Sequence, residues 1–393
     1  MSYKNVVLKD ARVVSVKRRH PWIFSGGVIR HDRCQDGDLV RVVTRKDQFL
    51  AVGYFQDASI MVRILSFEDR LIDETFWNER INAAIKARAI LGLPSEQTNA
   101  YRLIHGEGDG IPGLIIDIYN DIAVVQCHAI GIHKMSQTIA QGLFELLAPK
   151  GLKHIYIKGG NTLPREYASQ HVDGFLKGHA SKTRIIENGC LFQVNVKEGQ
   201  KTGFFLDQRM NRKLLQEQSK NKSVLNLFSY TGGFSIYAIN GGAKRVVSID
   251  ISERAINMCN ENVQLSKGRR IHEAITADVL KYLDEINEGE FDIIIVDPPA
   301  FAKSSRKKHN AVQAYKRLNA KALKKVRSGG MVFTFSCSQV IDRPLFYNTI
   351  TAAALEVKRE ISVIHTLSQG ADHPVSIYHP EGQYLKGLVL YVR

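Results

Sequence analysis

The stretch from residue 224 to residue 250, VLNLFSYTGGFSIYAINGGAKRVVSID, most constrains the fold of this chain. An apolar run, residues 224–228, stops at a turn of small residues that contains Gly232 and Gly233. A helical pattern follows, and a second apolar run ends on Asp250. This order of patterns predicts a strand, a glycine-bearing turn, a helix and a second strand, which is the repeating unit of a parallel α/β sheet.

The turn and the acid together predict a site for a nucleoside cofactor. Gly232 and Gly233 carry no Cβ, so the backbone can lie close to a ligand. An acid about 20 residues further on, here Asp250, can accept both hydroxyls of a ribose. The turn lacks the full G-x-G-x-x-G pattern that binds a dinucleotide pyrophosphate, so we favour S-adenosylmethionine, which has no phosphate. The turn alone leaves open a plain strand–helix–strand unit in which the glycines serve packing.

The rest of the chain after residue 224 repeats this alternation, which predicts a doubly wound parallel sheet. Ligands of such sheets bind outside the carboxyl ends of the strands. We therefore expect one cleft to collect Asp250, Asp278, Asp297 and Cys337, since each follows an apolar run. The expected elements are a short strand that ends at residues 275–278, a strand at 291–296, a helix at about 311–327 that ends at residues 328–330, and a strand at 331–335.

Residues 1–70 predict a small β-rich domain with a basic, aromatic surface. The sequences DGDLVRVVTRKDQFLAVGYF and SIMVRIL in this part resemble a PUA domain, an RNA-binding module of RNA-modifying enzymes. Lys17, Arg18 and Arg19 precede Trp22 and Phe24, and cations beside aromatic rings suit phosphate contact and base stacking. A core role for the two aromatic residues is the alternative. The apolar runs that predict the strands lie at residues 13–16, 39–43, 49–54 and 60–65.

Residues 71–185 predict a helical connector followed by a central α+β domain. A helical pattern covers residues 71–95. Asn120-Asp121 separates two apolar runs, which indicates a hairpin. The expected elements are strands at 114–119, 122–128 and 154–158 and a helix at about 132–148. We interpret the loop at residues 105–110, rich in glycine and acid, as a turn rather than as a phosphate or metal loop, because no strand–loop–helix context surrounds it.

Charge and composition narrow the class of partner. The formal net charge is +15 and the pI is about 9.5, which favours nucleic acid. No run of 18 apolar residues predicts a membrane span, and the N-terminus lacks a secretory pattern. Five cysteines without a C-x-x-C pair argue against a disulfide framework or a zinc site and for a cytoplasmic protein without a metal.

The segment Asp297-Pro298-Pro299-Ala300-Phe301 is the strongest single motif. Prolines directly after a buried strand fix φ and remove donors, so the turn is rigid. Its carbonyl groups and carboxylate can hold a planar base. Enzymes that methylate exocyclic amines usually have an aromatic residue where Ala300 stands, which weakens that interpretation although Phe301 is adjacent.

Cys337 is the candidate nucleophile. It follows an apolar strand, lies between two serines, and is expected at the same sheet edge as Asp297. A thiolate that adds to carbon 6 of a pyrimidine makes carbon 5 nucleophilic, and a base must later remove the carbon-5 proton. The alternative is a buried cysteine that acts as a small apolar residue. We interpret Cys34, Cys127, Cys190 and Cys259 as structural: two lie in expected strands, one lies in an expected helix, and Cys34 precedes a turn.

Several motifs together resemble the bacterial 23S ribosomal RNA (cytosine-5)-methyltransferases. They are residues 103–113, 202–209, 226–233, Asp250, residues 297–301 and residues 335–338. The resemblance implies an α/β fold with a PUA-like domain (1–70), a central α+β domain (71–185) and a Rossmann-like methyltransferase domain (186–393). It also implies S-adenosylmethionine as methyl donor, 23S ribosomal RNA as substrate, and Cys337 as covalent nucleophile.

The resemblance and the motifs give a set of expected site residues. Asp250 is expected on the cofactor's ribose, Asp278 near its adenine, and the Gly232 turn beside its methionine part. The complete expected cofactor set is Phe228, Tyr230, Thr231, Gly232, Asp250, Asp278, Asp297 and Pro298. The expected RNA contacts are Lys17, Arg18, Arg19, Arg306, Lys307 and Lys308.

One departure concerns product release. Another group of RNA cytosine-5 enzymes has a second cysteine after the proline of its Asp-Pro turn, where this chain has Pro299 and Ala300. Asp297 is then the candidate base for product release.

Three alternative functions remain open at this point. The first is methylation of uracil carbon 5, and the second is methylation of a ring or exocyclic nitrogen, in which case Cys337 is idle. A non-catalytic RNA-binding factor in ribosome assembly is the third, whereas the missing third glycine disfavours a nicotinamide dehydrogenase.

Overall fold

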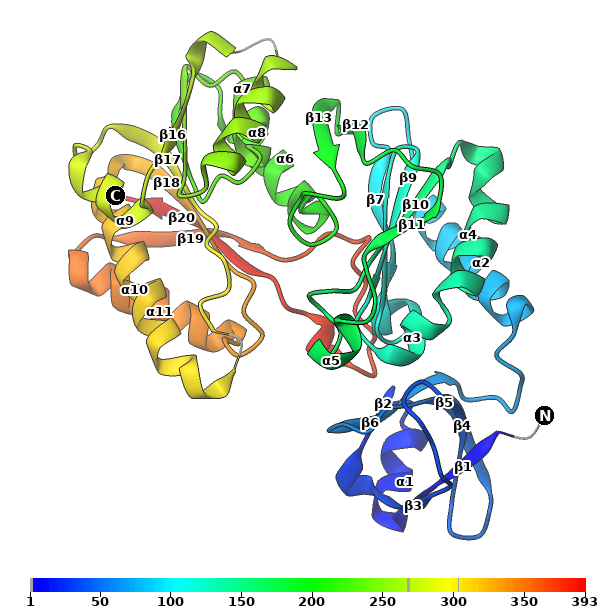
Figure 1. Cartoon of the computed structure of the whole chain (residues 1–393). Helices are drawn as coiled ribbons and strands as arrows, with labels where there is room; N and C mark the ends of the chain where they lie inside the picture. The colour runs from blue at the N-terminus through cyan, green and yellow to red at the C-terminus, as the bar shows by residue number, and fades with distance from the viewer. Residues whose placement is uncertain (1–2, 267–268, 303) are drawn as a thin grey trace. The chain divides into compact units, whose positions relative to one another are not determined.

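The computed structural model describes residues 3–266, 269–302 and 304–393. Contacts within the chain divide it into two compact units. Figure 1 colours the chain by residue number and labels its helices and strands. The first unit contains Met1–Ile186, Val194–Leu206 and Ala371–Gly382. The second unit contains Glu187–Gln193, Asp207–Gly370 and Gln383–Arg393. Each unit therefore uses segments that are distant in the sequence.

The N-terminal part of the first unit is a β-sheet in the order β2-β6-β5-β4-β1-β3. Its strands are β1 (Lys4–Leu8), β2 (Trp22–Phe24), β3 (Val28–His31), β4 (Leu39–Val43), β5 (Phe49–Phe55) and β6 (Ile60–Ser66). The expected strand at residues 13–16 is wrong, because these residues lie in helix α1 (Asp10–Lys17). Asp10 in the first turn and Lys17 in the last complement the helix dipole, and only Val16 of the helix is buried.

The central part of the first unit combines a second sheet, in the order β11-β10-β9-β8-β7, with helices. The strands are β7 (Ala100–His105), β8 (Leu114–Tyr119), β9 (Ile122–Cys127), β10 (His154–Lys158) and β11 (Gly174–Lys177). The helices are α2 (Glu74–Ile90), α3 (Ile130–Lys134), α4 (Ser136–Leu147) and α5 (Arg165–Ala168). The expected helix at 132–148 is divided at Met135, and the expected hairpin at Asn120-Asp121 joins β8 to β9.

The loop at residues 105–110 is a short 3₁₀ turn held by a buried ion pair. The Arg88 guanidinium donates to both carboxylate oxygens of Asp109, at 2.8 and 2.7 Å. The backbone N–H of His105 donates to the same carboxylate at 2.6 Å. Asp109 therefore stabilises the turn, as expected for a structural turn and not for a phosphate or metal loop.

A second buried ion pair lies beside the first. Arg102 donates to both oxygens of Asp117, at 2.7 and 2.8 Å. The Thr202 hydroxyl donates to Asp117 at 2.6 Å, and Asp372 accepts from the backbone N–H of Arg102 at 3.1 Å. Asp117 is completely buried, so its charge is balanced by partners on both oxygens and not by water.

The second unit is built on a sheet in the order β16-β15-β14-β17-β18-β20-β19. Its strands are β14 (Ser223–Leu227), β15 (Arg245–Asp250), β16 (His272–Thr276), β17 (Phe291–Val296), β18 (Val326–Ser336), β19 (Ile361–Leu367) and β20 (Lys386–Val392). β14 to β18 pair in parallel, and β20 runs antiparallel between β18 and β19. The predicted doubly wound α/β sheet is confirmed, with an antiparallel strand near one edge.

The helices of the second unit pack on its sheet in two groups. Figure 1 shows α6 to α8 on one side of the sheet and α9 to α11 on the other. Their bounds are α6 (Arg209–Gln218), α7 (Gly233–Asn240), α8 (Glu253–Gln264), α9 (Val279–Glu285), α10 (Lys308–Lys325) and α11 (Arg343–Val357). A separate two-stranded sheet consists of β12 (Lys182–Glu187) and β13 (Cys190–Asn195).

Residues 328–330 do not form the expected loop after α10. They lie inside β18, which begins at Val326 and pairs with both β17 and β20. A Cβ on Gly330 would lie 2.6 Å from the carbonyl oxygen of Asp292. Gly330 therefore permits two strands to approach closely and does not end a helix.

Among the described residues, no helix has the length and apolar character needed to cross a membrane.

Candidate active site

The carboxyl ends of the parallel strands gather the predicted site residues at one sheet edge. β15 ends at Asp250, Asp297 follows β17, and Cys337 follows β18. Asp278 follows β16 by two residues. The register of the strands places these ends level with one another, since Val296 lies between Leu227 and Thr334.

The turn after β14 has an unusual backbone that is fastened to Asp250. Phe228, Tyr230 and Gly232 have φ values of 57°, 47° and 81°, all in the left-handed region. The backbone N–H of Tyr230 donates to one oxygen of Asp250, and the N–H of Ser252 donates to the other, both at 2.9 Å. The carboxylate is therefore fixed at the end of β15 while its remaining lone pairs can accept from a ligand.

Gly232 has a packing role in this turn. A Cβ at this position would lie 2.5 Å from the sulfur of Cys259 on α8. The close approach that explains this glycine is therefore to a neighbouring helix, whereas the sequence suggested an approach to a ligand. Cys259 is completely buried, and burial raises the pKa of its thiol to about 11, which fits the structural role expected for it.

Three buried polar atoms beside this turn identify a place for a polar ligand. They are Oδ1 of Asn226, Oγ of Ser229 and Oγ1 of Thr231, and none has a hydrogen-bond partner among the described residues. A buried polar atom without a partner costs about 1–3 kcal/mol, so such atoms are rare in folded proteins. Together with the Asp250 carboxylate, this set of acceptors and hydroxyl groups fits a cofactor that carries ribose hydroxyls and an amino acid group.

Asp278 has a structural task that is visible in the structure. Its side chain is exposed and begins α9, where Oδ1 accepts from the N–H groups of Leu280 and Lys281, both at 3.0 Å. Helix capping therefore accounts for an acid at this position. The predicted contact between Asp278 and the adenine of a cofactor stays a prediction.

The Asp297 turn is supported by two amide side chains that the sequence analysis did not single out. Gln208 donates to Oδ2 of Asp297 at 3.1 Å, and Asn211 donates to Oε1 of Gln208 at 2.6 Å. Both amides are at least 96% buried. Pro298 is buried and Pro299 is exposed, so the turn has one side in the interior and one side toward solvent.

Cys337 is half-buried, and its two neighbours fasten it to the Asp297 turn. The Ser338 hydroxyl donates to the carbonyl oxygen of Ala302 at 2.7 Å. The Ser336 hydroxyl donates to the Tyr315 hydroxyl at 3.0 Å, and the Tyr315 ring meets the Phe301 ring edge-on at 4.7 Å. The Ser-Cys-Ser motif and the segment that begins at Asp297 are therefore held together.

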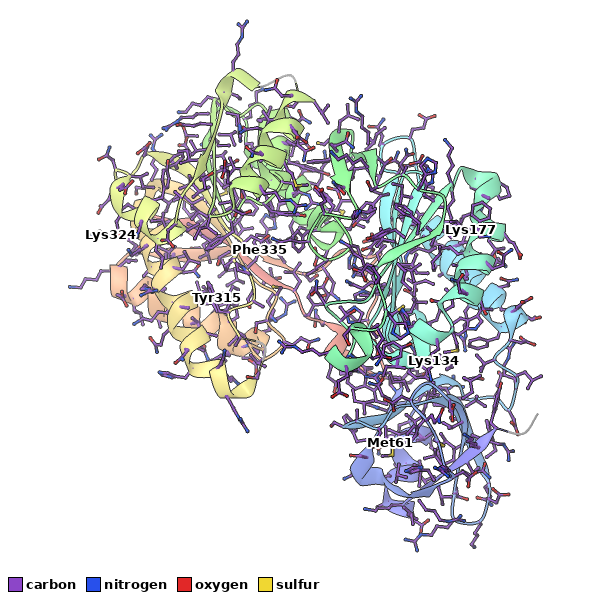
Figure 2. All side chains as sticks on the ribbon, in the orientation of Figure 1. Met61, Lys134, Lys177, Tyr315, Lys324 and Phe335 are labelled. Carbon is purple, nitrogen blue, oxygen red and sulfur yellow. The ribbon has the colours of Figure 1, made fainter. Side chains whose placement is uncertain are left out.

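Figure 2 helps to locate this connection, because it labels Tyr315 on α10 and Phe335 near the end of β18. Burial raises the pKa of the Tyr315 hydroxyl well above its usual value. The negative charges of Cys337 and Asp297 act in the same direction, which shows that both groups lie within electrostatic range of Tyr315.

The expected RNA contacts lie on exposed surfaces. Lys17, at the end of α1, and the following Arg18 and Arg19 are exposed. Arg306 and Lys307 lie in the 3₁₀ turn before α10, Lys308 begins that helix, and all three are exposed.

The two aromatic residues near Lys17 differ in exposure. The Trp22 indole N–H donates to Glu107 at 2.8 Å and its side chain is half-buried, so packing explains this residue. Phe24 is 49% exposed, which leaves a ring face accessible for stacking. The core alternative therefore fits Trp22 better than Phe24.

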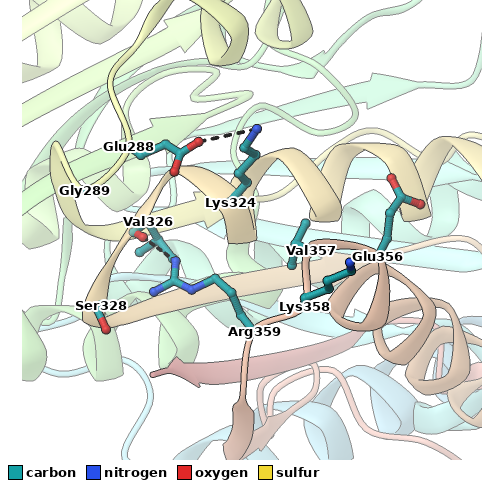
Figure 3. Close-up of a pocket in the computed structure, with 9 residues that line it drawn as sticks. All are labelled: Glu288, Gly289, Lys324, Val326, Ser328, Glu356, Val357, Lys358 and Arg359. Atoms are coloured by element: carbon teal, nitrogen blue, oxygen red, sulfur yellow. Dashed lines mark hydrogen bonds and ion pairs between the residues drawn. The ribbon is translucent and has the colours of Figure 1, made fainter.

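A hollow lies at the opposite, amino-end edge of the sheet (Figure 3). Its lining includes Glu288, Lys324, Val326 and Arg359. Lys324 pairs with Glu288 at 3.4 Å, and Arg359 donates to the carbonyl oxygen of Val326 at 2.7 Å. These charged groups are used within the fold, and ligands of parallel sheets bind at the other edge, so we do not assign the active site here.

Comparison with known sequences assigns the chain to a protein family. The pattern of the S-adenosylmethionine-dependent methyltransferase family matches residues 154–369, which is more than half of the chain. The chain belongs to this family. A PUA-like domain matches residues 6–67 of the methyltransferase, in agreement with the β-rich sheet at its N-terminus.

Full-length relatives extend this assignment. The protein named Ribosomal RNA large subunit methyltransferase I from Alteromonas mediterranea is 36% identical over 98% of both chains. The protein of the same name from Aeromonas salmonicida is 37% identical over 99% of both chains.

Solved structures share the fold of the methyltransferase. A putative SAM-dependent methyltransferase from Streptococcus mutans has a TM-score of 0.83 at 22% identity, with both chains covered completely. A putative methyltransferase solved in complex with SAH gives the same TM-score, identity and coverage.

The methyltransferase uses S-adenosylmethionine, as the turn without a complete dinucleotide pattern predicted. The predicted combination of a PUA-like domain with an α/β methyltransferase domain is also confirmed. Among the described residues there is no group of three or more His, Cys, Asp or Glu side chains placed to hold a metal ion.

Proposed function

We propose that this methyltransferase makes 5-methylcytosine in 23S ribosomal RNA of the large subunit through a covalent adduct at Cys337. The full-length relatives named Ribosomal RNA large subunit methyltransferase I support the class of substrate. The net charge of +15 supports a polyanionic partner. In this proposal residues 1–70 and 71–185 dock the RNA, and residues 186–393 carry the chemistry.

One observation carries the chemical part of the proposal. Cys337 is half-buried at the carboxyl edge of the sheet and is fastened to the Asp297 turn through Ser338 and Ala302. Cys127 and Cys259 lie in the interior, as expected for structural cysteines, and the half-buried Cys34 lies outside the methyltransferase sheet, so Cys337 is distinguished by its place at the sheet edge. In our proposal the cofactor binds at this edge, and a partly accessible thiol beside a rigid turn would attack an extruded base there.

S-adenosylmethionine supplies the methyl group as an electrophile on its sulfonium, and the residues of the chain prepare the base that accepts it. The Cys337 thiolate forms a bond to carbon 6 of the pyrimidine, and the electron pair of the 5,6 double bond makes carbon 5 nucleophilic. After carbon 5 is methylated, a base removes its proton, the double bond re-forms and the carbon–sulfur bond breaks. The Cys337 thiolate is thus regenerated, and the proton taken up by the base passes to solvent.

Asp297 is the proposed base for the last proton transfer. Its Oδ2 accepts from Gln208, which is itself held by Asn211, so the carboxylate has a fixed orientation. The backbone of the Pro298-Pro299 turn would support the plane of the base. Cys337 and Asp297 are therefore the proposed catalytic pair.

The proposed cofactor residues surround the turn after β14. Asp250 would accept the ribose hydroxyls, and Ser229 and Thr231 offer hydroxyl groups without partners among the described residues. Phe228, Tyr230 and Gly232 shape this turn, and Asp278 and Pro298 complete the proposed set. The proposed RNA contacts are the exposed cations Lys17, Arg18, Arg19, Arg306, Lys307 and Lys308.

Analysis of the methylated product tests this function. Purified protein is incubated with S-adenosylmethionine and 23S ribosomal RNA that lacks the modification, and the RNA is digested to nucleosides for mass spectrometry. We expect 5-methylcytidine. A product that is 5-methyluridine, or a nucleoside methylated on nitrogen, would contradict the assignment to cytosine carbon 5. No methylated nucleoside despite cofactor binding would favour a non-catalytic assembly factor.

A further inference from the structure

A buried lysine lies beside the Ser-Cys-Ser motif. Lys386 begins β20 and is 4% exposed. Its ammonium group donates to the carbonyl oxygen of Ser338 at 2.7 Å and to that of Tyr384 at 2.6 Å. Ser338 is the residue that follows Cys337, so the cation is fastened to the segment that carries the candidate nucleophile.

The environment of this cation is unusual for a buried charge. Removing an ammonium group from water costs several kcal/mol unless a partner of opposite charge compensates for it. No carboxylate forms an ion pair with Lys386 among the described residues. Two carbonyl oxygens therefore satisfy two of its three donors but leave its charge without a carboxylate counterion.

The charges around Lys386 identify its partner. Burial lowers the pKa of its ammonium group to about 8, and the opposing effect of the Cys337 thiolate is the largest effect of any nearby charge. Arg343 and Asp342, at the start of α11, act in opposite directions on this pKa. On α10, Tyr315 lies within electrostatic range of both Cys337 and Asp297. Cys337 is thus the principal anionic group that acts on Lys386.

We propose that Lys386 is a positioning residue that holds Cys337 in its thiolate form. This inference rests on the proposed role of Cys337 as nucleophile. The sulfur–hydrogen bond ionises, the proton leaves to solvent, and the ammonium group of Lys386 stays protonated and stabilises the anion. The thiolate then forms the bond to carbon 6 of the base. Lys386 itself contacts neither the substrate nor the cofactor in this scheme.

The bonds of Lys386 also fix the backbone beside Cys337. The bond to the Ser338 carbonyl group fixes the backbone just after Cys337, while the bond to Tyr384 fixes the start of β20. Two roles are therefore combined, an electrostatic one and a mechanical one. Substitutions that keep the hydrogen bond but remove the charge can separate them.

The test measures the alkylation rate of Cys337 as a function of pH. Iodoacetamide reacts with the thiolate, so the rate follows the thiolate fraction, and mass spectrometry of the peptide that contains Cys337 gives this rate for one site. Lys386→Gln keeps a neutral amide donor toward Ser338, Lys386→Met removes both donor and charge, and Lys386→Arg keeps the charge. Cofactor binding by calorimetry shows that each variant is folded.

A matched control is present in the same chain. Lys158 is also buried, at 9% exposure, and also donates to two carbonyl oxygens, those of Gly199 and Lys201, both at 2.8 Å. It lies in the other unit of the structure. Lys158→Gln removes a comparable buried cation and should leave the Cys337 alkylation profile unchanged.

We expect the midpoint of the alkylation profile to rise by about one pH unit or more in Lys386→Gln and Lys386→Met, the size expected for removal of one nearby charge. Lys386→Arg should keep the midpoint of the wild-type enzyme. A profile of Lys386→Gln that superimposes on the wild type would overturn the inference. A shift of equal size in Lys158→Gln would also overturn it, since the effect would then report general loosening.

The wild-type protein provides a test that needs no variant. Cys34 is also half-buried, and burial raises the pKa of its thiol. The Cys337 profile should have the lower midpoint of the two, and a midpoint equal to or above that of Cys34 would contradict the inference. Alkylation does not require methyl transfer, so failure of the proposed function would appear separately, as an active Cys337→Ala enzyme.

Discussion

Two sets of buried polar groups in this protein are organised in opposite ways. In the first unit, the charge network formed by Arg88–Asp109 and Arg102–Asp117 pairs both oxygens of each carboxylate. At the carboxyl edge of the second unit, the side-chain oxygens of Ser229 and Thr231 are buried and lack partners among the described residues. The first arrangement is complete within the chain, whereas we propose that a ligand completes the second.

This difference separates buried polar groups that stabilise the fold from buried polar groups that could bind a ligand. Complete networks stabilise the fold, because every buried charge has been compensated within the chain. Incomplete sets cost about 1–3 kcal/mol per buried atom, and binding of a ligand is one way to offset that cost. The two buried lysines form similar bonds to carbonyl oxygens, but Lys386 donates to the residue that follows Cys337, whereas Lys158 donates to Gly199 in the first unit.

The largest expected effect separates chemistry from stability at the carboxyl edge. Cys337→Ala should reduce turnover at least about a thousandfold, the size expected for deletion of a nucleophile, while cofactor affinity and the melting temperature change little. Single-turnover methylation and calorimetry measure the two quantities. Cys259→Ala is the matched control, and loss of activity there but not at Cys337 would reverse the assignment.

The next effect should fall on stability alone. Asp117→Ala leaves Arg102 buried without its counterion, so the free energy of unfolding should drop by about 3–5 kcal/mol. Urea denaturation measures this. The exposed pair of Asp284 with Lys321 offers a control, because Asp284→Ala should cost at most about 1 kcal/mol. Equal costs at the two sites would remove the distinction between complete buried networks and surface pairs.

A smaller effect concerns cofactor affinity. Asp250→Ala should weaken S-adenosylmethionine binding by about 10- to 100-fold, because hydrogen bonds from the ribose to a charged acceptor are lost. Calorimetry measures the dissociation constant. Asp278→Ala, at an exposed helix cap, should have the weaker effect on binding. An unchanged affinity of Asp250→Ala would move the cofactor site away from the end of β15.

The smallest effect is a change in acid sensitivity of the first unit. Burial, together with the charges of Arg102 and Arg88, lowers the pKa of His105 to about 2. The unfolded chain therefore binds this proton first, so stability is complete above about pH 6.5 and falls below it by about 1.4 kcal/mol per pH unit. His105→Asn should flatten this slope between pH 6.5 and pH 5 in urea denaturation. An unchanged slope would assign the acid sensitivity to other groups.

Local patterns predicted the second unit well. The strands before Asp250, Asp297 and Cys337 are mostly buried and have sharp ends, so the positions of these three residues at the ends of strands followed from the sequence. Errors arose where pairing and local pattern disagree. The valines at residues 13–16 lie in a helix, and residues 328–330 belong to strand β18, in which Gly330 pairs with Val392 of β20.

Contacts between distant residues account for the features that sequence patterns missed. Gln208 is 89 residues from Asp297, and Lys386 is 48 residues from Ser338, so neither bond has a local signature. A single lysine at the head of the apolar run KGLVLYV was the only sequence sign of a buried cation. Likewise, the packing of Gly232 against Cys259 becomes visible only when α8 is placed.

The most direct test of the central claim is covalent trapping with RNA that contains 5-fluorocytosine, in which fluorine replaces the proton that must leave carbon 5. The account predicts a protein–RNA adduct that survives denaturation, forms only with S-adenosylmethionine present, and maps to the peptide with Cys337. RNA that contains 5-fluorouracil should give no adduct with the wild-type protein. The Cys337→Ala variant should give no adduct with RNA that contains 5-fluorocytosine. An enzyme that methylates cytosine in unmodified RNA but is never trapped, or an adduct on another residue, would contradict the account.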